Sequence, residues 1–282
     1  VLVHRNILAD SFGIGKTFDF KKRDVFLTVT PLFHNSGQIM STVGPLWCGG
    51  ITIAVRSDMG LLNFWFFVDQ FGINWSLVMP AHVNLLLESP RKNQNNTLKG
   101  LFCGGAKLEP ERQKEFEQRF GTPLYPNYGL TETASIAICA IPDDPTKASG
   151  STGKPLYIND VKILTENGIA GIFEEGEIHI KGPNIFKEYL NKPHITNEKL
   201  TDGWLHTGDL GYMDEYRNVF IVDRIDNMVL VGGENIYPAD VEKIVPQLEG
   251  IAEAILVPVP HKILGNEIVL VYRLLKDGEE DI

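Results

Sequence analysis

The first part of the chain alternates strand-like runs with helical patterns, and this alternation limits the fold more than any other feature. Runs rich in β-branched and aromatic residues occur at residues 25–30, 51–55, 73–79 and 98–103. Helical patterns are expected at about residues 38–47, 61–71, 80–88 and 109–120. Such alternation predicts an α/β fold whose mostly parallel sheet is covered on both faces by helices.

The sequence pattern then changes twice. The turn-rich stretch P-D-D-P-T-K-A-S-G-S is followed by short strand patterns with hairpin signals at residues 161–164, 176–180, 211–213 and 218–222. After Asp226 come a strand at 228–231, a helix at about 239–248, and strands near 251–257 and 268–272. We predict three parts: an α/β part of a large domain (1–150), an antiparallel β subdomain (151–225) and a partial small α+β domain (226–282).

Composition narrows the class of protein. Of the 282 residues, 43% are hydrophobic and 22% charged, as in soluble globular proteins. A net charge of −10 argues against a nucleic-acid partner, because phosphate backbones attract basic surfaces. The three cysteines form no C-x-x-C motif, which favours buried free thiols in a reducing compartment. No apolar run approaches the roughly 20 residues of a transmembrane helix. We therefore expect a cytoplasmic protein.

Three polar or glycine-rich loops follow predicted strands: P-L-F-H-N-S-G at 31–37, G-G-A at 104–106 and Y-P-N-Y-G-L-T-E-T at 125–133. Ligands of open α/β sheets bind beyond the carboxyl ends of the strands, so these loops are expected to form one rim. The segment G-I-G-K at 13–16 has the glycines of a phosphate-binding loop but lacks its spacing, and no strand leads into it. We do not interpret it as a phosphate site.

The loop at 125–133 carries the chemistry of a nucleotide site. Tyr128 offers a flat ring, Gly129 a closely approachable backbone, Thr131 a hydroxyl donor and Glu132 a hard oxygen ligand for Mg²⁺. An ordinary helix start explains the same residues equally well, with Thr131 as the N-cap and Glu132 in the first turn.

Other candidates are ambiguous when taken singly. Gly104 and Gly105 would let a ligand lie on the backbone, but most such pairs are turns. His34 is either a packed residue or a polar contact near a carboxylate substrate. In H-T-G-D-L, Gly208 would turn the chain sharply and present Asp209 to a ribose, or simply form an Asx turn. Arg224 could contact the same ligand or pair locally with Asp223 or Asp226.

Together, six ordered motifs resemble the adenylate-forming superfamily, and most of all its acyl-CoA synthetases. They are P-L-F-H-N-S-G, F-C-G-G-A, N-Y-G-L-T-E-T, W-L-H-T-G-D-L-G, V-D-R-I-D-N-M and G-G-E-N-I-Y-P-A-D-V-E. The resemblance implies that a carboxylate attacks the α-phosphate of ATP to give an acyl-adenylate, from which the thiol of coenzyme A displaces AMP.

The resemblance also implies roles for individual residues. Thr131, Glu132 and His34 would be catalytic, with Glu132 the Mg²⁺ ligand. Residues expected to bind ATP or AMP are Gly104, Gly105, Ala106, Asn127, Tyr128, Gly129, Leu130, Thr131, Asp209, Ile221 and Arg224. Asp226 would be the hinge between two half-reactions, and Gly232 and Gly233 would bind coenzyme A.

We therefore expect an ATP-dependent ligase of a carboxylic acid, fatty or otherwise apolar, with ATP, Mg²⁺ and coenzyme A as its cofactors. The family's triphosphate loop and C-terminal catalytic lysine are not found, so we expect this stretch to adenylate poorly. Two alternatives remain open: a non-catalytic binding protein for a nucleotide or acyl-adenylate, and the adenylation domain of a peptide synthetase with a carrier-protein thiol as acceptor. A homodimer also stays open. A dehydrogenase is disfavoured, because no G-x-G-x-x-G follows a strand.

Overall fold

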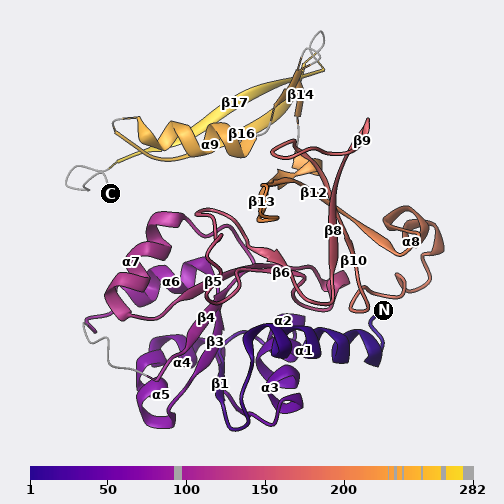
Figure 1. Cartoon of the computed structure of the whole chain (residues 1–282). Helices are drawn as coiled ribbons and strands as arrows, with labels where there is room; N and C mark the ends of the chain where they lie inside the picture. The colour runs from indigo at the N-terminus through magenta and orange to yellow at the C-terminus, as the bar shows by residue number, and fades with distance from the viewer. Residues whose placement is uncertain are drawn as a thin grey trace. The chain divides into compact units, whose positions relative to one another are not determined.

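The computed structural model describes residues 1–91, 97–227, 229–231, 234–236, 238–248, 250–261 and 265–275 (Figure 1). The chain forms two compact units, one of residues 1–207 with 211–221 and the other of residues 208–210 with 222–282. The predicted limits of the three domains stay a prediction.

The central sheet of the larger unit has the strand order β2-β1-β3-β4-β5-β6-β7. Its strands are β1 (Val25–Thr28), β2 (Ile51–Ala54), β3 (Trp75–Val78), β4 (Gly100–Cys103), β5 (Leu124–Tyr128), β6 (Ile138–Cys139) and β7 (Lys154–Pro155). The first five run parallel, β6 pairs antiparallel with β5, and β7 pairs antiparallel with β6. The four strands predicted from residues 25–103 are all present.

Alternate strand residues serve two cores, because successive side chains point to opposite faces of a sheet. On β1, Phe26 joins the core beside helix α1 (His4–Phe18), whereas Leu27 joins the core beside α5 (Phe64–Phe71), α6 (Pro80–Leu87) and α7 (Pro110–Phe120). Figure 1 shows α1 and α3 (Gly44–Trp47) on one side of this sheet and α4 (Ser57–Leu62) to α7 on the other. The predicted α/β fold with both faces covered is confirmed.

The helices that pack on the first sheet differ from prediction in three places. The expected helix at 38–47 begins earlier, as α2 (Asn35–Gln38), and passes through a π-helical turn (Ile39–Val43) into α3. The expected helix at 61–71 breaks at Asn63 into α4 and α5. Helix α1 was not predicted, because its glycines and buried polar residues weaken the helical pattern. Those glycines allow close packing: a Cβ on Gly13 would lie 2.8 Å from Ile158 Cγ1, and one on Gly15 would lie 2.5 Å from Cys48 Sγ.

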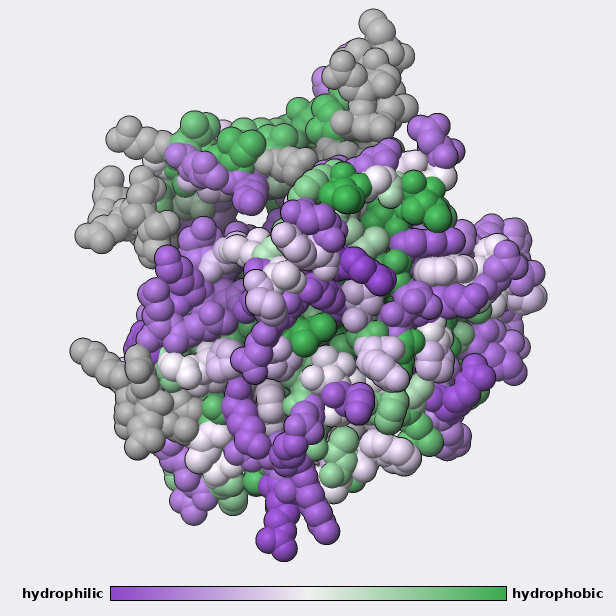
Figure 2. Space-filling model, in the orientation of Figure 1, coloured by the Kyte–Doolittle hydropathy of each residue, from purple (hydrophilic) through white to green (hydrophobic). Residues whose placement is uncertain are grey.

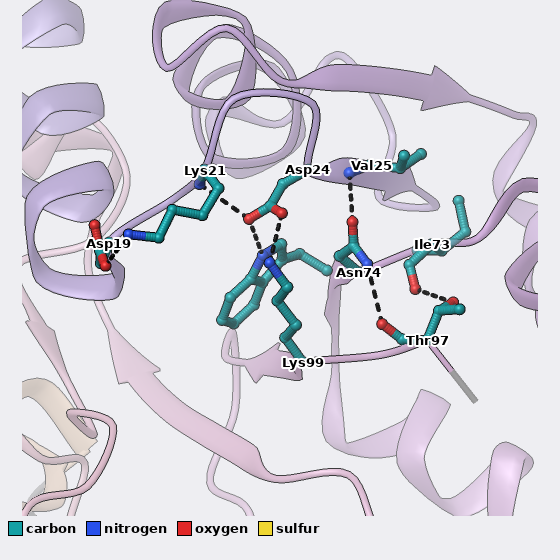
Figure 3. Close-up of polar contacts among 9 residues, drawn as sticks. Asp19, Lys21, Asp24, Val25, Ile73, Asn74, Thr97 and Lys99 are labelled. Carbon is teal, nitrogen blue, oxygen red and sulfur yellow. Dashed lines mark hydrogen bonds and ion pairs between the residues drawn. The ribbon is translucent and has the colours of Figure 1, made fainter. Parts of the chain in front are cut away.

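Polar contacts fasten the amino-terminal ends of β1, β3 and β4 to one another (Figure 3). Asp24 accepts hydrogen bonds from Lys99 Nζ at 2.6 Å and from Trp75 Nε1 at 3.0 Å. The Asn74 side chain accepts from the Val25 backbone N–H at 2.9 Å and donates to the Thr97 carbonyl at 3.1 Å. These bonds lie at the end of the sheet opposite to the predicted rim.

A second sheet has the order β11-β12-β10-β8-β9, with β13 beside β12. Its strands are β8 (Asp160–Thr165), β9 (Gly168–Ile169), β10 (Gly176–Lys181), β11 (Leu200–Thr201), β12 (Trp204–Met213) and β13 (Val219–Arg224), and α8 (Pro193–Lys199) precedes β11. Ile163, Ile178 and Leu205 are buried in a third core, which also takes in Ala137 and Ile138 from the first sheet. The strands predicted between residues 161 and 222 are confirmed.

In its described residues the smaller unit contains two antiparallel strand pairs and one α-helix. Strands β14 (Val229–Val231) and β15 (Glu234–Ile236) pair antiparallel, as do β16 (Ile251–His261) and β17 (Gly265–Leu274), and helix α9 (Pro238–Ile244) lies between them in sequence. Figure 2 shows hydrophobic atoms gathered over the longer hairpin, where Val257, Val269 and Leu274 are exposed. Among the described residues, no helix has both the length and the apolar character to cross a bilayer. The three cysteines are free, and Cys103 and Cys139 are buried.

Candidate active site

A cavity of about 260 Å³ opens at the carboxyl ends of the parallel strands in the larger unit. All three predicted loops contribute to its wall, as does the end of β3. The lining residues are Thr30, His34, Asn35, Ser36, Leu77, Val78, Met79, Gly104, Gly105, Asn127, Gly129, Leu130, Thr131, Ser135 and Ile136. The structure thus brings together seven of the residues to which the sequence assigned a role: His34, Gly104, Gly105, Asn127, Gly129, Leu130 and Thr131.

Gly104 makes room for a polar side chain of the neighbouring loop. A Cβ at this position would lie 2.2 Å from Oδ1 of Asn127, far inside van der Waals contact. The next residue, Gly105, has φ +85°, a conformation that glycine adopts without strain. The glycine pair therefore places the Asn127 amide at the cavity wall and leaves bare backbone beside it.

The chain folds back on itself at Gly129, and this close approach requires glycine. A Cβ here would lie 1.8 Å from the backbone oxygen of Ser135, so the five residues between them form a tight loop around the 3₁₀ turn Thr131–Thr133. Ala134 has φ +65°, in the left-handed region. Asn35 clamps this loop from outside, since its Nδ2 donates to the carbonyl of Leu130 at 3.3 Å and to that of Ala134.

A buried polar cluster holds the same loop from beneath. Asn184 is fully buried, and its Nδ2 donates to the carbonyls of Thr133 at 3.0 Å and Ile136 at 3.3 Å. Its Oδ1 accepts from Asn159 Nδ2 at 2.7 Å, and its Nδ2 also lies 3.3 Å from Oδ1 of Asp10 on α1. Asn184 therefore joins the cavity loop to helix α1 and to the segment before β8.

Burial raises the pKa of Asp10 well above its usual 3.8, although hydrogen bonds from Asn184 and from the Ile136 backbone act in the opposite direction. The folded protein therefore holds this proton to a higher pH than the unfolded chain. Between pH 3.8 and the raised pKa the native state binds more protons, so stability falls as pH rises through that interval.

We expect Asp10→Asn to remove this pH dependence, because an amide does not ionise. In urea unfolding near pH 7, the variant should be more stable than the natural chain, and the difference should shrink as the pH approaches about 4. Asp160→Asn, which changes an exposed aspartate of β8, serves as the control and should keep the natural slope. A constant difference at all pH values would show that Asp10 is ionised in the folded protein.

Thr131 is exposed at the cavity, and Glu132 follows it half-buried. Oε1 of Glu132 accepts a hydrogen bond of 2.6 Å from the hydroxyl of Tyr189, and the Glu132 carbonyl accepts from the Phe186 N–H at 2.7 Å. Burial, and then the bond to Glu132, raise the pKa of Tyr189 well above its usual range. A single fixed carboxylate beside this cavity could hold Mg²⁺, which takes one or two carboxylates together with phosphates. Thr131 itself lies inside the turn and does not cap it.

Three further predicted residues lie in the larger unit but do not line the cavity. Ala106 is exposed just after the glycine pair. Tyr128 is half-buried, and its ring packs against the core of the second sheet. Ile221 packs against the same core. Their assigned roles stay predictions.

Asp209 and Arg224 meet within the smaller unit. Arg224 Nη1 lies 3.1 Å from Oδ1 of Asp209, whose side chain is buried. The prediction of a sharp turn at Gly208 is wrong, because residues 204–213 form one strand in which Gly208 keeps φ +74°. Asp226 lies in a 3₁₀ turn (Ile225–Asn227) between β13 and β14, and Gly232 and Gly233 lie outside the described residues.

Several residues of the site were not singled out from sequence. Asn35 belongs to a predicted loop and Met79 ends a predicted strand, so the rule of carboxyl strand ends could have found both. Tyr189 and Asn184 gave no signal, because each contacts the loop from more than 50 residues away in sequence.

A sheet with its cavity beyond the carboxyl strand ends defines the class of α/β proteins that bind small molecules at this edge. A family model described as AMP-binding enzyme matches residues 1–190. The chain therefore belongs to the AMP-binding enzyme family.

Curated relatives include sulfoacetate–CoA ligase of Cupriavidus necator, 31% identical over 271 residues, and 2-succinylbenzoate–CoA ligase of Geobacillus kaustophilus, 31% identical over 269 residues. The matches cover 95% of this chain but 53% and 54% of those proteins. The chain thus spans about half the length of the curated relatives that it matches.

Two solved structures are also similar to this chain. ATP-bound MatB from Rhodopseudomonas palustris matches with a TM-score of 0.87 and 26% identity over 99% of this chain and 55% of that one. The o-succinylbenzoate CoA synthetase MenE from Bacillus subtilis, in complex with the acyl-adenylate OSB-AMP, matches with a TM-score of 0.87 and 27% identity, over 98% and 56%.

Proposed function

We propose that the protein to which this chain belongs is an ATP-dependent carboxylic acid–CoA ligase that acts through an acyl-adenylate. The observation that carries this proposal is the glycine-lined cavity at the carboxyl ends of β1, β3, β4 and β5. The family match and the CoA ligases among the relatives support it.

In the first half-reaction, a carboxylate oxygen of the acid attacks the α-phosphorus of ATP and pyrophosphate leaves. In the second, the thiol of coenzyme A attacks the acyl carbon, AMP leaves, and the thiol proton passes to solvent or a base. We propose that Asn127 and Thr131 donate to the nucleotide phosphates and that bare backbone at Gly104 and Gly105 lets the adenylate lie close.

We further propose that Glu132 holds Mg²⁺, which would neutralise phosphate charge when bound. Tyr189 positions that carboxylate through its 2.6 Å hydrogen bond. Asp209 would accept hydrogen bonds from the ribose hydroxyls, with Arg224 beside it, and Asp226 would be the hinge. His34, exposed at the cavity, would contact the acyl carboxylate.

We propose no substrate class narrower than a carboxylic acid. The relatives are named for sulfoacetate and 2-succinylbenzoate, so their names lend no support to the fatty acid expected from sequence.

Thr131→Val tests the nucleotide site, because it removes the hydroxyl and nearly keeps the side-chain shape. We expect a non-hydrolysable acyl-sulfamoyl adenosine to bind the natural chain in calorimetry, and the variant to bind at least about tenfold more weakly, since a hydrogen bond to a charged group contributes roughly 1.5–3 kcal/mol. Thr201→Val, an exposed threonine of β11, is the matched control and should bind normally.

Equal binding by both variants would contradict the role of Thr131, and no binding by the natural chain would contradict the nucleotide cavity. A coupled AMP-release assay on the same samples separates the alternatives. Binding without turnover favours a non-catalytic binding protein, and turnover that requires free coenzyme A favours the ligase over a peptide-synthetase domain.

A further inference from the structure

Two imidazoles and one carboxylate gather on the second sheet, outside the cavity. Glu177 and His179 are two residues apart on β10 and so point to one face, and His206 lies on the neighbouring strand β12. One possible ligand atom from each residue lies within 4.8 Å of the other two. No other group of three such ligands this close is found in the described part of the chain.

The contacts within this group are short and specific. His179 Nε2 lies 3.0 Å from Oε2 of Glu177, and the ring centroids of His179 and His206 are 4.1 Å apart. Around a tetrahedral ion with bonds of about 2.0–2.1 Å, ligand atoms lie roughly 3.3 Å apart. Small side-chain rotations therefore suffice to bring all three onto one ion.

Both histidines are shielded from water to some degree. His179 is almost fully buried, at 3% exposure, and His206 is half-buried. A neutral imidazole keeps the nitrogen lone pair that binds a metal ion.

Two nearby lysines would repel a cation, but both of their ammonium groups lie near the Trp204 ring. Lys162 Nζ lies 4.3 Å from the centre of the Trp204 ring, and Lys181 Nζ lies 5.7 Å from it. The Glu177 carboxylate offsets part of the remaining positive field. Two nitrogens and one oxygen select ions that bind imidazole well, such as Zn²⁺, Co²⁺, Ni²⁺ and Cu²⁺, over Mg²⁺ or Ca²⁺.

We propose that Glu177, His179 and His206 form a three-ligand site for a divalent transition-metal ion of the zinc class. The ion would cross-link β10 to β12, the strand on which Asp209 also lies. The site is independent of the proposed ligase chemistry, since it shares no residue with the cavity.

The probe is Co²⁺, whose visible absorption reports tetrahedral nitrogen and oxygen ligands, titrated into the chain after treatment with a chelator. We expect one ion per chain, displaced by Zn²⁺ and bound more weakly as pH falls. His206→Gln and Glu177→Gln should each weaken binding at least about tenfold, because even residues that only support metal ligands change affinity 10- to 100-fold. Far-ultraviolet circular dichroism checks that both variants are folded.

His194→Gln is the matched control. This exposed histidine lies 3.3 Å from Glu198 on α8, so it offers an imidazole and a carboxylate, with no third ligand close by among the described residues. It should leave the cobalt spectrum and affinity unchanged. Unchanged affinity in folded His206→Gln and Glu177→Gln, or loss of binding in His194→Gln, would overturn the proposal.

Discussion

Gly129→Ala is expected to abolish ligand binding at the cavity. The added Cβ would lie 1.8 Å from the Ser135 oxygen, 2.7 Å from its carbonyl carbon and 2.9 Å from Ile136 Cα. All three are backbone atoms, so no side-chain rotation relieves the overlap and the loop must move. Because a misplacement of about 1 Å in an active site can cost roughly 100-fold in rate, we expect a comparable loss of ligand contacts here. We expect at least that loss of affinity for the acyl-sulfamoyl adenosine, measured by calorimetry.

Two further glycine variants make this result interpretable. Gly104→Ala collides only with the Asn127 amide, at 2.2 Å, so the chain should fold normally and lose affinity to a smaller degree. Gly171→Ala meets nothing closer than Glu174 Oε2 at 3.5 Å and should behave like the natural chain. Full binding by a folded Gly129→Ala protein would show that the loop around Thr131 plays no part in the site.

Asn184→Ala is expected to have the largest effect on stability. It removes the donor to the Thr133 and Ile136 carbonyls and the acceptor for Asn159, and all of these groups are buried or partly buried. Each buried polar group that loses its partner costs about 1–3 kcal/mol, so we expect the free energy of unfolding to fall by roughly 3 kcal/mol or more. Urea unfolding followed by circular dichroism measures it.

Asn197→Ala, at an exposed position of α8, is the matched control and should change stability by less than about 0.5 kcal/mol. Because Asn184 supports the cavity loop, its variant should also bind the acyl-adenylate analogue more weakly where it remains folded. A loss of stability below about 1 kcal/mol would mean that water or neighbouring groups replace the lost hydrogen bonds.

The sequence predicted the parallel sheet because its signal is local. Strand patterns at residues 25–30 and 98–103 need no knowledge of their partners, and the rule that ligands bind beyond carboxyl strand ends then placed the loops at Gly104 and Thr131 at one cavity. The same local reasoning went wrong at Gly208, where a glycine with positive φ sits within a strand rather than at a turn. It also missed α1, because this helix depends on tertiary packing that leaves no local sequence pattern.

Sequence alone thus determined the fold class, the order of the strands along the chain and the loops that meet at the cavity, because each follows from patterns within a few residues. Only the tertiary structure decided what holds those loops: Asn35 and Asn184 clamp the turn, Tyr189 fixes Glu132, and Gly129 is required by Ser135. It also decided that His179 and His206 lie side by side. These contacts join residues far apart in sequence, and hydrogen bonds and steric overlap depend on distances that only the folded chain sets.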